Sequence, residues 1–398
     1  MKKIFLTTIT LLSIASASVF GMYGANSGWI NFLTHGNQFR ARMEQLGFTL
    51  GNDTIKGTFG FFNDGRGAYG SMLSQSTATG EAGTGLYYDF TPTISMGLAY
   101  TSSLISVGVG YNATIGPRWD RFNGKTDSKK VEAVVHTPVL VLNAMDNAFR
   151  MAIPIQVVNL TEKVDGLGKG SITAVSLDAQ FRYYTGLDFL PQIRLYIKYG
   201  NYGTQFNPEG AEKIKETFAE SFGFDFRLYF GSMVEEVALQ PIVKLAYNGA
   251  LGKQHSNTKV TALGALTDSA NVAGQFASAF LGGGATVAPT YGGNEAWKKG
   301  AWDLTLAPAL GLTANSDIVS LYVEPSLGLK ITQPGSATDN KAKELYSLAW
   351  GAYAEIYITP LKNLEWYFEA DVGNDANSGG TPVKFAASTG ITWYLPAL

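Results

Sequence analysis

Apolar and polar residues alternate along most of the C-terminal half of the chain. In NLEWYFEADVGN, residues 363–374, one parity carries apolar side chains and the other mostly acidic ones. The same period of two recurs in AWDLTLAPALGLTA from 301, DIVSLYVEPSLGLKI from 317 and PVKFAASTGITWYL from 382. Because successive side chains of a strand point to opposite faces, this pattern predicts amphipathic β-strands. Similar strands are predicted to begin near 104, 147, 171, 192, 222, 236 and 345, whereas 132–142 is ambiguous because Val and Leu occupy both parities.

Three features favour a membrane barrel over a soluble β-sandwich, which also buries one face of each strand. The apolar parity runs for ten or more residues without a charge, which matches a tilted membrane strand of about 9–11 residues. The polar parity holds small residues and both charge signs, as expected of a watery lumen. Aromatic residues gather near strand ends, for example Tyr183 with Tyr184 and Trp393 with Tyr394, which is typical of interfacial girdles.

The lengths of the predicted connections alternate. Long links are expected at 115–130, 159–170, 201–218, 249–300 and 332–344, with an intermediate one at 374–382, and short links at 143–147, 186–190, 232–235, 315–316 and 359–362. Twelve strands follow Leu104, the runs 84–91 and 93–102 add two, and the segment 39–62 adds two more. The predicted fold is therefore all-β, a transmembrane antiparallel barrel of outer-membrane type with 14 or 16 strands, short periplasmic turns and long external loops.

The N-terminus has the pattern of a secretory signal peptide. MKKIFLTTITLLSIASASVFG places Lys2 and Lys3 before an apolar run and small residues, with cleavage expected after Gly21 or after Ala17. The apolar run is too short for an uncleaved anchor helix, which requires about 20 residues. The expected organisation is a cleaved signal peptide at 1–21 and one outer-membrane β-barrel domain at 22–398.

Composition excludes several functions. The chain of 398 residues has no Cys, which rules out disulfides and thiol catalysis, and its formal net charge of −2 offers no basic excess for nucleic acid. Of its three histidines, His136 lies in the ambiguous strand, where an inward orientation toward an acid would resemble an outer-membrane hydrolase, but no Ser or Asp partner motif accompanies it. We expect no enzyme activity, no metal and no cofactor.

Residues 22–48, MYGANSGWINFLTHGNQFRARMEQLGF, followed by GNDTIKGTFGF at 51–61, resemble the variable surface proteins of Brachyspira, an intestinal spirochaete. The resemblance implies an integral outer-membrane surface antigen with surface-exposed loops, assembled into homo-oligomers. It supplies no catalytic residues. The partners that it implies are outer-membrane lipid and host or antibody contacts through the loops.

The predicted inward parity collects charges of opposite sign in different parts of the chain. Acidic residues crowd the C-terminal third, where Lys330 also points inward, and basic residues line the middle third. The candidate pore-lining residues are Asp303, Glu324, Lys330, Glu355, Glu365, Glu369, Asp371, Arg182, Arg194, Lys198, Arg227 and Lys244. Acidic and basic walls set up a transverse electric field across the interior. Such a field suits a porin-like channel for passive diffusion of small hydrophilic solutes that is also a major surface antigen.

Two alternatives stay open. The charges also fit a filled or plugged interior, in which case the protein is a non-conducting structural or adhesin barrel involved in host interaction or antigenic variation. The loop at 249–300, far longer than ordinary connections, folds either inward as a constriction or outward as an antigenic surface.

Overall fold

The computed structural model describes residues 29–42, 45–63, 74–80, 83–89, 92–121, 129–164, 168–208, 214–234, 237–251, 253–254, 298–300, 302–333, 343–374 and 383–395. The predicted signal peptide at 1–21 and most of the loop at 249–300 lie outside these ranges.

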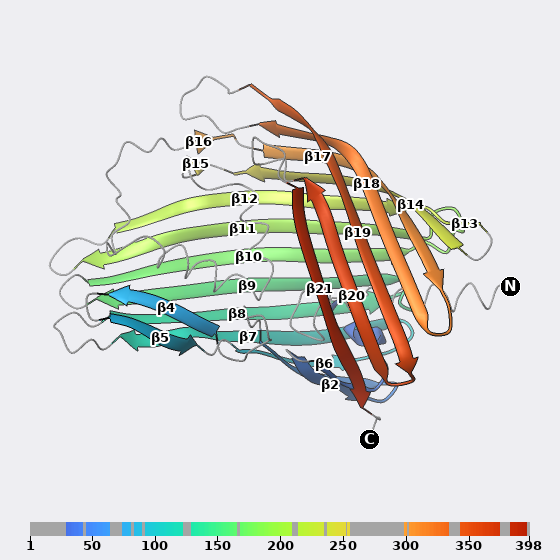
Figure 1. The fold of residues 1–398 in the computed structure, drawn as a ribbon, viewed down its shortest axis with the longest axis horizontal. Helices are drawn as coiled ribbons and strands as arrows, with labels where there is room; N and C mark the ends of the chain where they lie inside the picture. Colours follow the sequence, from blue (N-terminus) through green and yellow to red (C-terminus); the bar gives the residue numbers. More distant parts are fainter. Residues whose placement is uncertain are drawn as a thin grey trace.

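The described residues form β-strands and one short 3-10 turn (Figure 1). Their bounds are η1 (Phe32–Thr34), β1 (Gln38–Arg42), β2 (Gln45–Gly51), β3 (Ile55–Asn63), β4 (Ser74–Gly80), β5 (Gly83–Asp89), β6 (Pro92–Tyr100), β7 (Ile105–Arg121), β8 (Lys129–Ala144), β9 (Phe149–Val164), β10 (Gly168–Tyr184), β11 (Gln192–Pro208), β12 (Ile214–Tyr229), β13 (Ser232–Val234), β14 (Val237–Ala250), β15 (Lys253–Gln254), β16 (Lys298–Lys299), β17 (Trp302–Asn315), β18 (Val319–Gln333), β19 (Leu345–Leu361), β20 (Leu364–Asn374) and β21 (Val383–Leu395). No helix among the described residues is long and apolar enough to cross a membrane.

Within the described part of the chain, seventeen strands form one sheet that closes on itself. Each strand of the ring pairs antiparallel with the next, and β21 returns to β1 through Phe39↔Leu395 and Ala41↔Trp393. The short β13 pairs with the first residues of β14 beside the β12–β14 pairing, so the ring itself consists of the other sixteen strands. Closure satisfies the edge hydrogen bonds that hydrocarbon cannot solvate. The predicted antiparallel outer-membrane barrel is confirmed.

One strand of the predicted ring is wrong. The predicted run at 84–91 corresponds to β5, which pairs with β4 in a separate two-stranded sheet. Its place is taken by β1, which pairs with β2 through the register Gln38↔Thr49 to Arg42↔Gln45. The predicted turn around Gly51-Asn52-Asp53 is confirmed, with the Asn52 side-chain oxygen accepting hydrogen bonds from the backbone N–H groups of Thr54 and Ile55.

Three predicted long links are mostly strand. β7 to β12 each contain 16 or 17 residues and occupy most of 115–130, 159–170 and 201–218. A strand needs roughly 9–11 residues to span hydrocarbon, so these strands are several residues longer than the span requires. At about 3.3 Å per residue they reach about 55 Å. Figure 1 shows these strands running far to the left, opposite to the end that carries the short turns.

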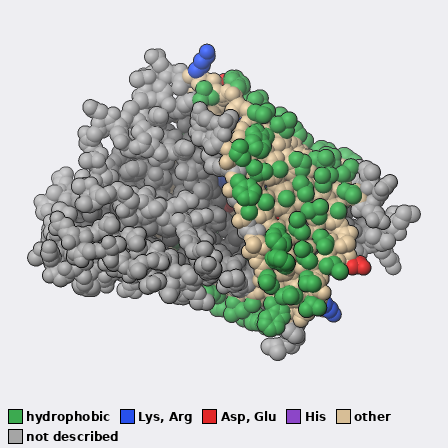
Figure 2. Space-filling view, viewed as in Figure 1, with side chains coloured by type: hydrophobic (Ala, Val, Ile, Leu, Met, Phe, Trp, Pro, Cys, Tyr) green, Lys and Arg blue, Asp and Glu red, His purple; other side chains and the backbone are tan. Residues whose placement is uncertain are grey.

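The outer face of the ring is apolar. Leu98, Val109 and Leu327 are each about 60% exposed, and Trp366 and Trp393 are half-exposed on the same face. Figure 2 shows hydrophobic side chains spread over the outer face of the C-terminal strands, with charged side chains at its margins. Exposed apolar area of this extent is unfavourable in water, so lipid is the solvent that this face requires.

The main apolar core lies inside the ring, beneath residues 29–35, which we call the N-terminal segment. Its buried side chains, Trp29, Ile30, Phe32 and Leu33, cluster with inward-facing residues of β6, β8 and β9: Ala99, Val139, Val141 and Ala152. A Cβ added at Gly110 would lie 2.4 Å from the Trp29 ring, so the wall needs glycine there for the indole to fit. The ambiguity of 132–142 is thereby explained, because β8 is apolar toward lipid on one side and toward this segment on the other.

Candidate functional site

The predicted interior residues lie on the inward parity of their strands. Alternation of exposure fixes this face: on β17, Asp303 and Thr313 are buried, whereas Leu306 and Leu310 are exposed outward. Residues paired across neighbouring strands point to the same face of a sheet. The pairings, for example Arg182↔Arg194 and Glu369↔Ser388, therefore extend the inward assignment from strand to strand around the ring. That these residues line a conducting pore stays a prediction.

Five basic residues of neighbouring strands form a single row on this face. β9 pairs with β10 at Arg150↔Arg182, β10 with β11 at Arg182↔Arg194, β11 with β12 at Arg194↔Arg227, and β12 with β14 at Arg227↔Lys244. We call these five residues the cationic row. Neighbouring strands are about 4.8 Å apart, so the row extends about 19 Å along the inner wall.

Tyrosine rings hold the guanidinium groups of the cationic row. The Cζ atom of Arg150 lies 4.8 Å from the centre of the Tyr184 ring, and that of Arg194 lies 4.4 Å from the centre of the Tyr229 ring. Arg227 lies 5.0 Å from the Tyr196 ring centre. Each tyrosine lies on the neighbouring strand, two residues beyond the register partner of its arginine, so the alternation of the strands places ring and cation on the same face.

The opposite charge gathers on β17 to β20, as predicted. We call the six residues Asp303, Glu324, Glu355, Glu365, Glu369 and Asp371 the acidic wall. Its members interact with hydroxyl groups rather than lying bare: Tyr353 donates to Glu355, Tyr394 donates to Glu365 at 3.3 Å, and Thr332 donates to Asp303 at 2.7 Å. Asp371 is exposed, whereas Glu355 faces Glu369 directly across the β19–β20 pairing.

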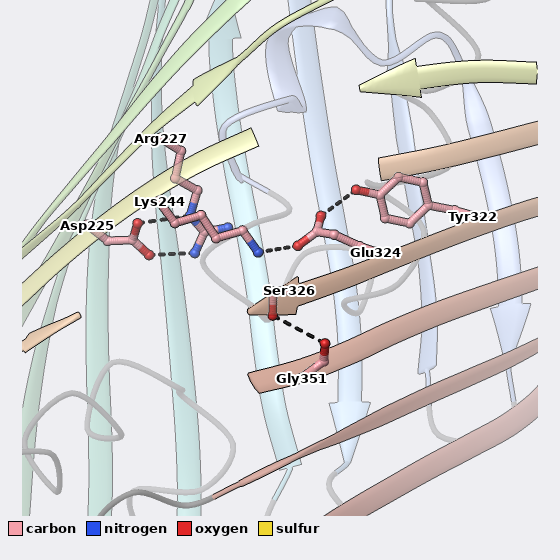
Figure 3. Close-up of polar contacts among 7 residues, drawn as sticks. All are labelled: Asp225, Arg227, Lys244, Tyr322, Glu324, Ser326 and Gly351. Carbon is pink, nitrogen blue, oxygen red and sulfur yellow. Dashed lines mark hydrogen bonds and ion pairs between the residues drawn. The ribbon is translucent and has the colours of Figure 1, made fainter. Parts of the chain in front are cut away.

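One ion pair joins the cationic row to the acidic wall. Figure 3 shows Lys244 reaching Glu324, whose second carboxylate oxygen accepts the hydroxyl of Tyr322. Beside it, Arg227 donates two hydrogen bonds to Asp225, at 2.5 and 2.9 Å. These side chains are partly exposed, 28% for Arg227 and 23% for Lys244, as expected where charges contact water.

Two predicted basic residues lie outside the cationic row. Lys330 sits 3.6 Å from Asp303 and therefore belongs with the acidic wall. Lys198 lies two inward positions beyond Arg194 on β11, in register with Asp178 of β10.

The cationic row also binds the N-terminal segment. Arg150 and Arg182 both donate to the side-chain oxygen of Asn31, at 3.0 and 3.4 Å. On the other flank Lys56 donates to the backbone carbonyls of Leu33 and His35, at 2.8 and 2.7 Å. Polar contacts from β3, β9 and β10 therefore fix a segment whose apolar side chains pack on the wall.

Sequence reasoning missed Arg150 and the N-terminal segment. A signal for Arg150 was available, because FRMAIPIQ alternates from Phe149 and places the arginine on the polar parity. The signal for the segment is the spacing of Trp29, Ile30, Phe32 and Leu33, which is helical rather than alternating.

His136 does not point inward. Its neighbours Val135 and Thr137 are buried on the inner face, whereas His136 is exposed on the outer face and bonds the hydroxyl of Tyr111. The considered inward histidine was therefore wrong. Among the described residues, no group of three or more His, Cys, Asp or Glu side chains is arranged to hold a metal ion.

Comparison with known families decides the family of the chain. The family model described as Serpulina hyodysenteriae variable surface protein matches residues 2–394. The chain belongs to this family. The resemblance of the segments at 22–48 and 51–61 is confirmed and extends over nearly the whole variable surface protein. With its closed ring and apolar outer face, this family member is an outer-membrane protein.

Solved structures of outer-membrane proteins are distantly similar. The translocator domain of autotransporter NalP from Neisseria meningitidis has 12% identity over 74% of this chain and 89% of its own, with a TM-score of 0.31. The copper transporter OprC has 10% identity over 90% of this chain and 64% of its own, with a TM-score of 0.39. CdiB from Escherichia coli has 9% identity over 90% of this chain and 62% of its own, with a TM-score of 0.41. No curated protein matches. Because the TM-scores lie below 0.5, the assignment of the barrel rests on the strand pairings.

Proposed function

We propose that this variable surface protein is a porin-like channel for passive diffusion of small hydrophilic solutes, and also a major surface antigen. The observation that carries the proposal is the cationic row on β9 to β14 lying next to the acidic wall on β17 to β20 inside one closed ring. Charges of both signs in hydrated surroundings set up a transverse field that orients dipolar and charged solutes.

The N-terminal segment covers only one part of the inner wall. Its apolar cluster lies on β6, β8 and β9, whereas most of the cationic row and all of the acidic wall lie on β10 to β20. The charged part of the interior is therefore the path that we propose for solutes.

Planar bilayer recording tests this function. The purified, folded protein should insert with stepwise increases in conductance, and the double variant Lys244→Gln with Glu324→Gln should conduct with altered ion selectivity, because it removes the ion pair between the two walls. A barrel shown to be folded in the same membranes that stays silent over many insertions would contradict the channel.

The N-terminal segment favours a second candidate, a non-conducting structural or adhesin barrel. A plug fixed by Arg150, Arg182 and Lys56 is the arrangement that such a protein would need. Under this candidate the bilayer stays silent while intact cells bind antibody raised against 249–300. Failure of intact cells to react would argue that this loop is not exposed.

The remaining parts of the proposal concern chemistry and assembly. We propose no enzyme activity, since transport and antigenicity require no covalent step. We also propose homo-oligomers in the membrane, which chemical cross-linking of whole cells followed by denaturing electrophoresis would show as discrete multiples of the monomer.

A further inference from the structure

The cationic row carries more positive charge than its neighbours balance. Among the described residues, ion pairs join its five basic side chains to two carboxylates, Asp225 paired with Arg227 and Glu324 paired with Lys244, which leaves a local excess of three positive charges. Arg182 and Arg194 are direct cross-strand partners on β10 and β11. Like charges in this position repel, so an anion between them would be stabilising.

Two donors at the centre of the row are unused. Among the described residues, the buried Nε–H groups of Arg182 and Arg194 have no hydrogen-bond partner, and Arg182 as a whole is 6% exposed. The acid nearest along the same strand, Asp178, is four residues away, about 13 Å in an extended strand. Asp178 is instead the cross-strand register partner of Lys198 on β11.

The row is also held in place before any ligand arrives. The rings of Tyr184, Tyr229 and Tyr196 lie against three of its guanidinium groups, with Cζ 4.4 to 5.0 Å from the ring centres, and these contacts restrain the arginine side chains. Gln192 accepts one hydrogen bond from Arg194 at 2.9 Å. Fixed, planar donors bind carboxylate and phosphate oxygens better than flexible ammonium groups do.

The contact with Asn31 indicates which kind of acceptor group these arginine donors bind. A single carboxamide oxygen receives hydrogen bonds from both Arg150 and Arg182, although it carries no formal charge. An anionic oxygen at the neighbouring donors of Arg182 and Arg194 would gain the same hydrogen bonds and also offset the excess charge.

We propose that the cationic row binds oxyanions, that is, small solutes bearing a phosphate or carboxylate group, with Arg182 and Arg194 at its centre. If the row acts as the selectivity site of a channel, that role rests on the proposed function. Binding itself does not require conduction, and the two are therefore tested separately.

Equilibrium binding to the folded, detergent-solubilised protein is the first test. Isothermal titration with inorganic phosphate, with acetate and with chloride should show saturable binding of the oxyanions and not of chloride. Arg194→Gln should weaken the binding about tenfold or more, because it removes charge-assisted hydrogen bonds. Arg194→Lys should have an oxyanion affinity between those of the original protein and Arg194→Gln, since the charge remains but the planar guanidinium is lost.

A variant outside the row controls for net charge. Lys362→Gln removes one positive charge from an exposed turn, and its oxyanion affinity should equal that of the original protein. Heat-modifiable migration on gels reports whether each variant is folded. Equal losses in Lys362→Gln and Arg194→Gln, or no saturable binding by the original protein, would overturn the proposal.

Bilayer recording separates this inference from the channel itself. If the protein conducts chloride, added phosphate or acetate should reduce the current saturably in the original protein, a result that needs no variant. Conductance that oxyanions leave unchanged, with no binding by titration, rejects the site and keeps the channel. Saturable binding by a protein that never conducts keeps the site and rejects the channel.

Discussion

At the scale of single residues, the face on which a side chain lies decides what its substitution does. Leu327 is 59% exposed on the outer face of β18, whereas its neighbour Ser326 faces inward and donates to the carbonyl of Gly351. Leu327→Arg should destabilise the folded barrel by about 2–4 kcal/mol near the bilayer midplane. Ser326→Arg should insert normally, because its charge meets the polar interior. Reversible unfolding in lipid vesicles measures both, and a Ser326→Arg variant less stable than Leu327→Arg would mean that the two faces are assigned the wrong way round.

The ion pair between Lys244 and Glu324 gives a prediction that concerns selectivity rather than stability. Both side chains are partly exposed, so losing the pair should change the free energy of unfolding by no more than about 1 kcal/mol. Glu324→Gln leaves Lys244 without its carboxylate and should shift the reversal potential toward anions. Glu344→Gln, in an exposed position before β19, is the control that should leave the potential unchanged. A shift toward cations would contradict the assigned role.

At the scale of elements, glycines in the wall make room for the Trp29 ring of the N-terminal segment. Gly110→Val should overpack the Trp29 contact by about 1–3 kcal/mol and raise the undocked population roughly 5- to 150-fold. The chain has no Cys, so a single Ile30→Cys substitution reports docking through its rate of maleimide labelling.

Labelling of Ile30→Cys should be slow alone and much faster with Gly110→Val. The control is Gly57→Val on the outward parity of β3, where an added Cβ would find its nearest atoms at 3.9 to 4.0 Å. Fast labelling of Ile30→Cys without any second substitution would show that the segment does not occupy the interior of the protein in a membrane.

At the scale of the whole molecule, the two charged walls predict how selectivity depends on salt. The Debye length is about 30 Å at 0.01 M and about 3 Å at 1 M salt, compared with the 19 Å that we estimate for the row. Ion selectivity, measured as the reversal potential across a fixed concentration ratio, should therefore be strong in dilute salt and nearly lost at 1 M. A potential independent of ionic strength would point to steric selection instead.

The sequence and the structure agree most closely where one physical constraint acts on each strand. β17 to β21 separate lipid from a polar interior, so their alternation was sufficient to assign Val323 outward and Glu324 inward. It failed for β8, because Val139 and Val141 meet the N-terminal segment and are as apolar as the residues that meet lipid. A second apolar partner inside the ring erases the period of two.

The sequence by itself determined the fold class and the facing of most charged side chains, since these follow from local alternation and the length of a membrane span. Only the tertiary structure decided that β1 rather than β5 completes the ring, that Arg150 joins four other cations in one row, and that residues 29–35 lie inside. Each of these depends on cross-strand register or on contacts between distant segments, such as Asn31 with Arg182, and neither is encoded in the local pattern of a single strand.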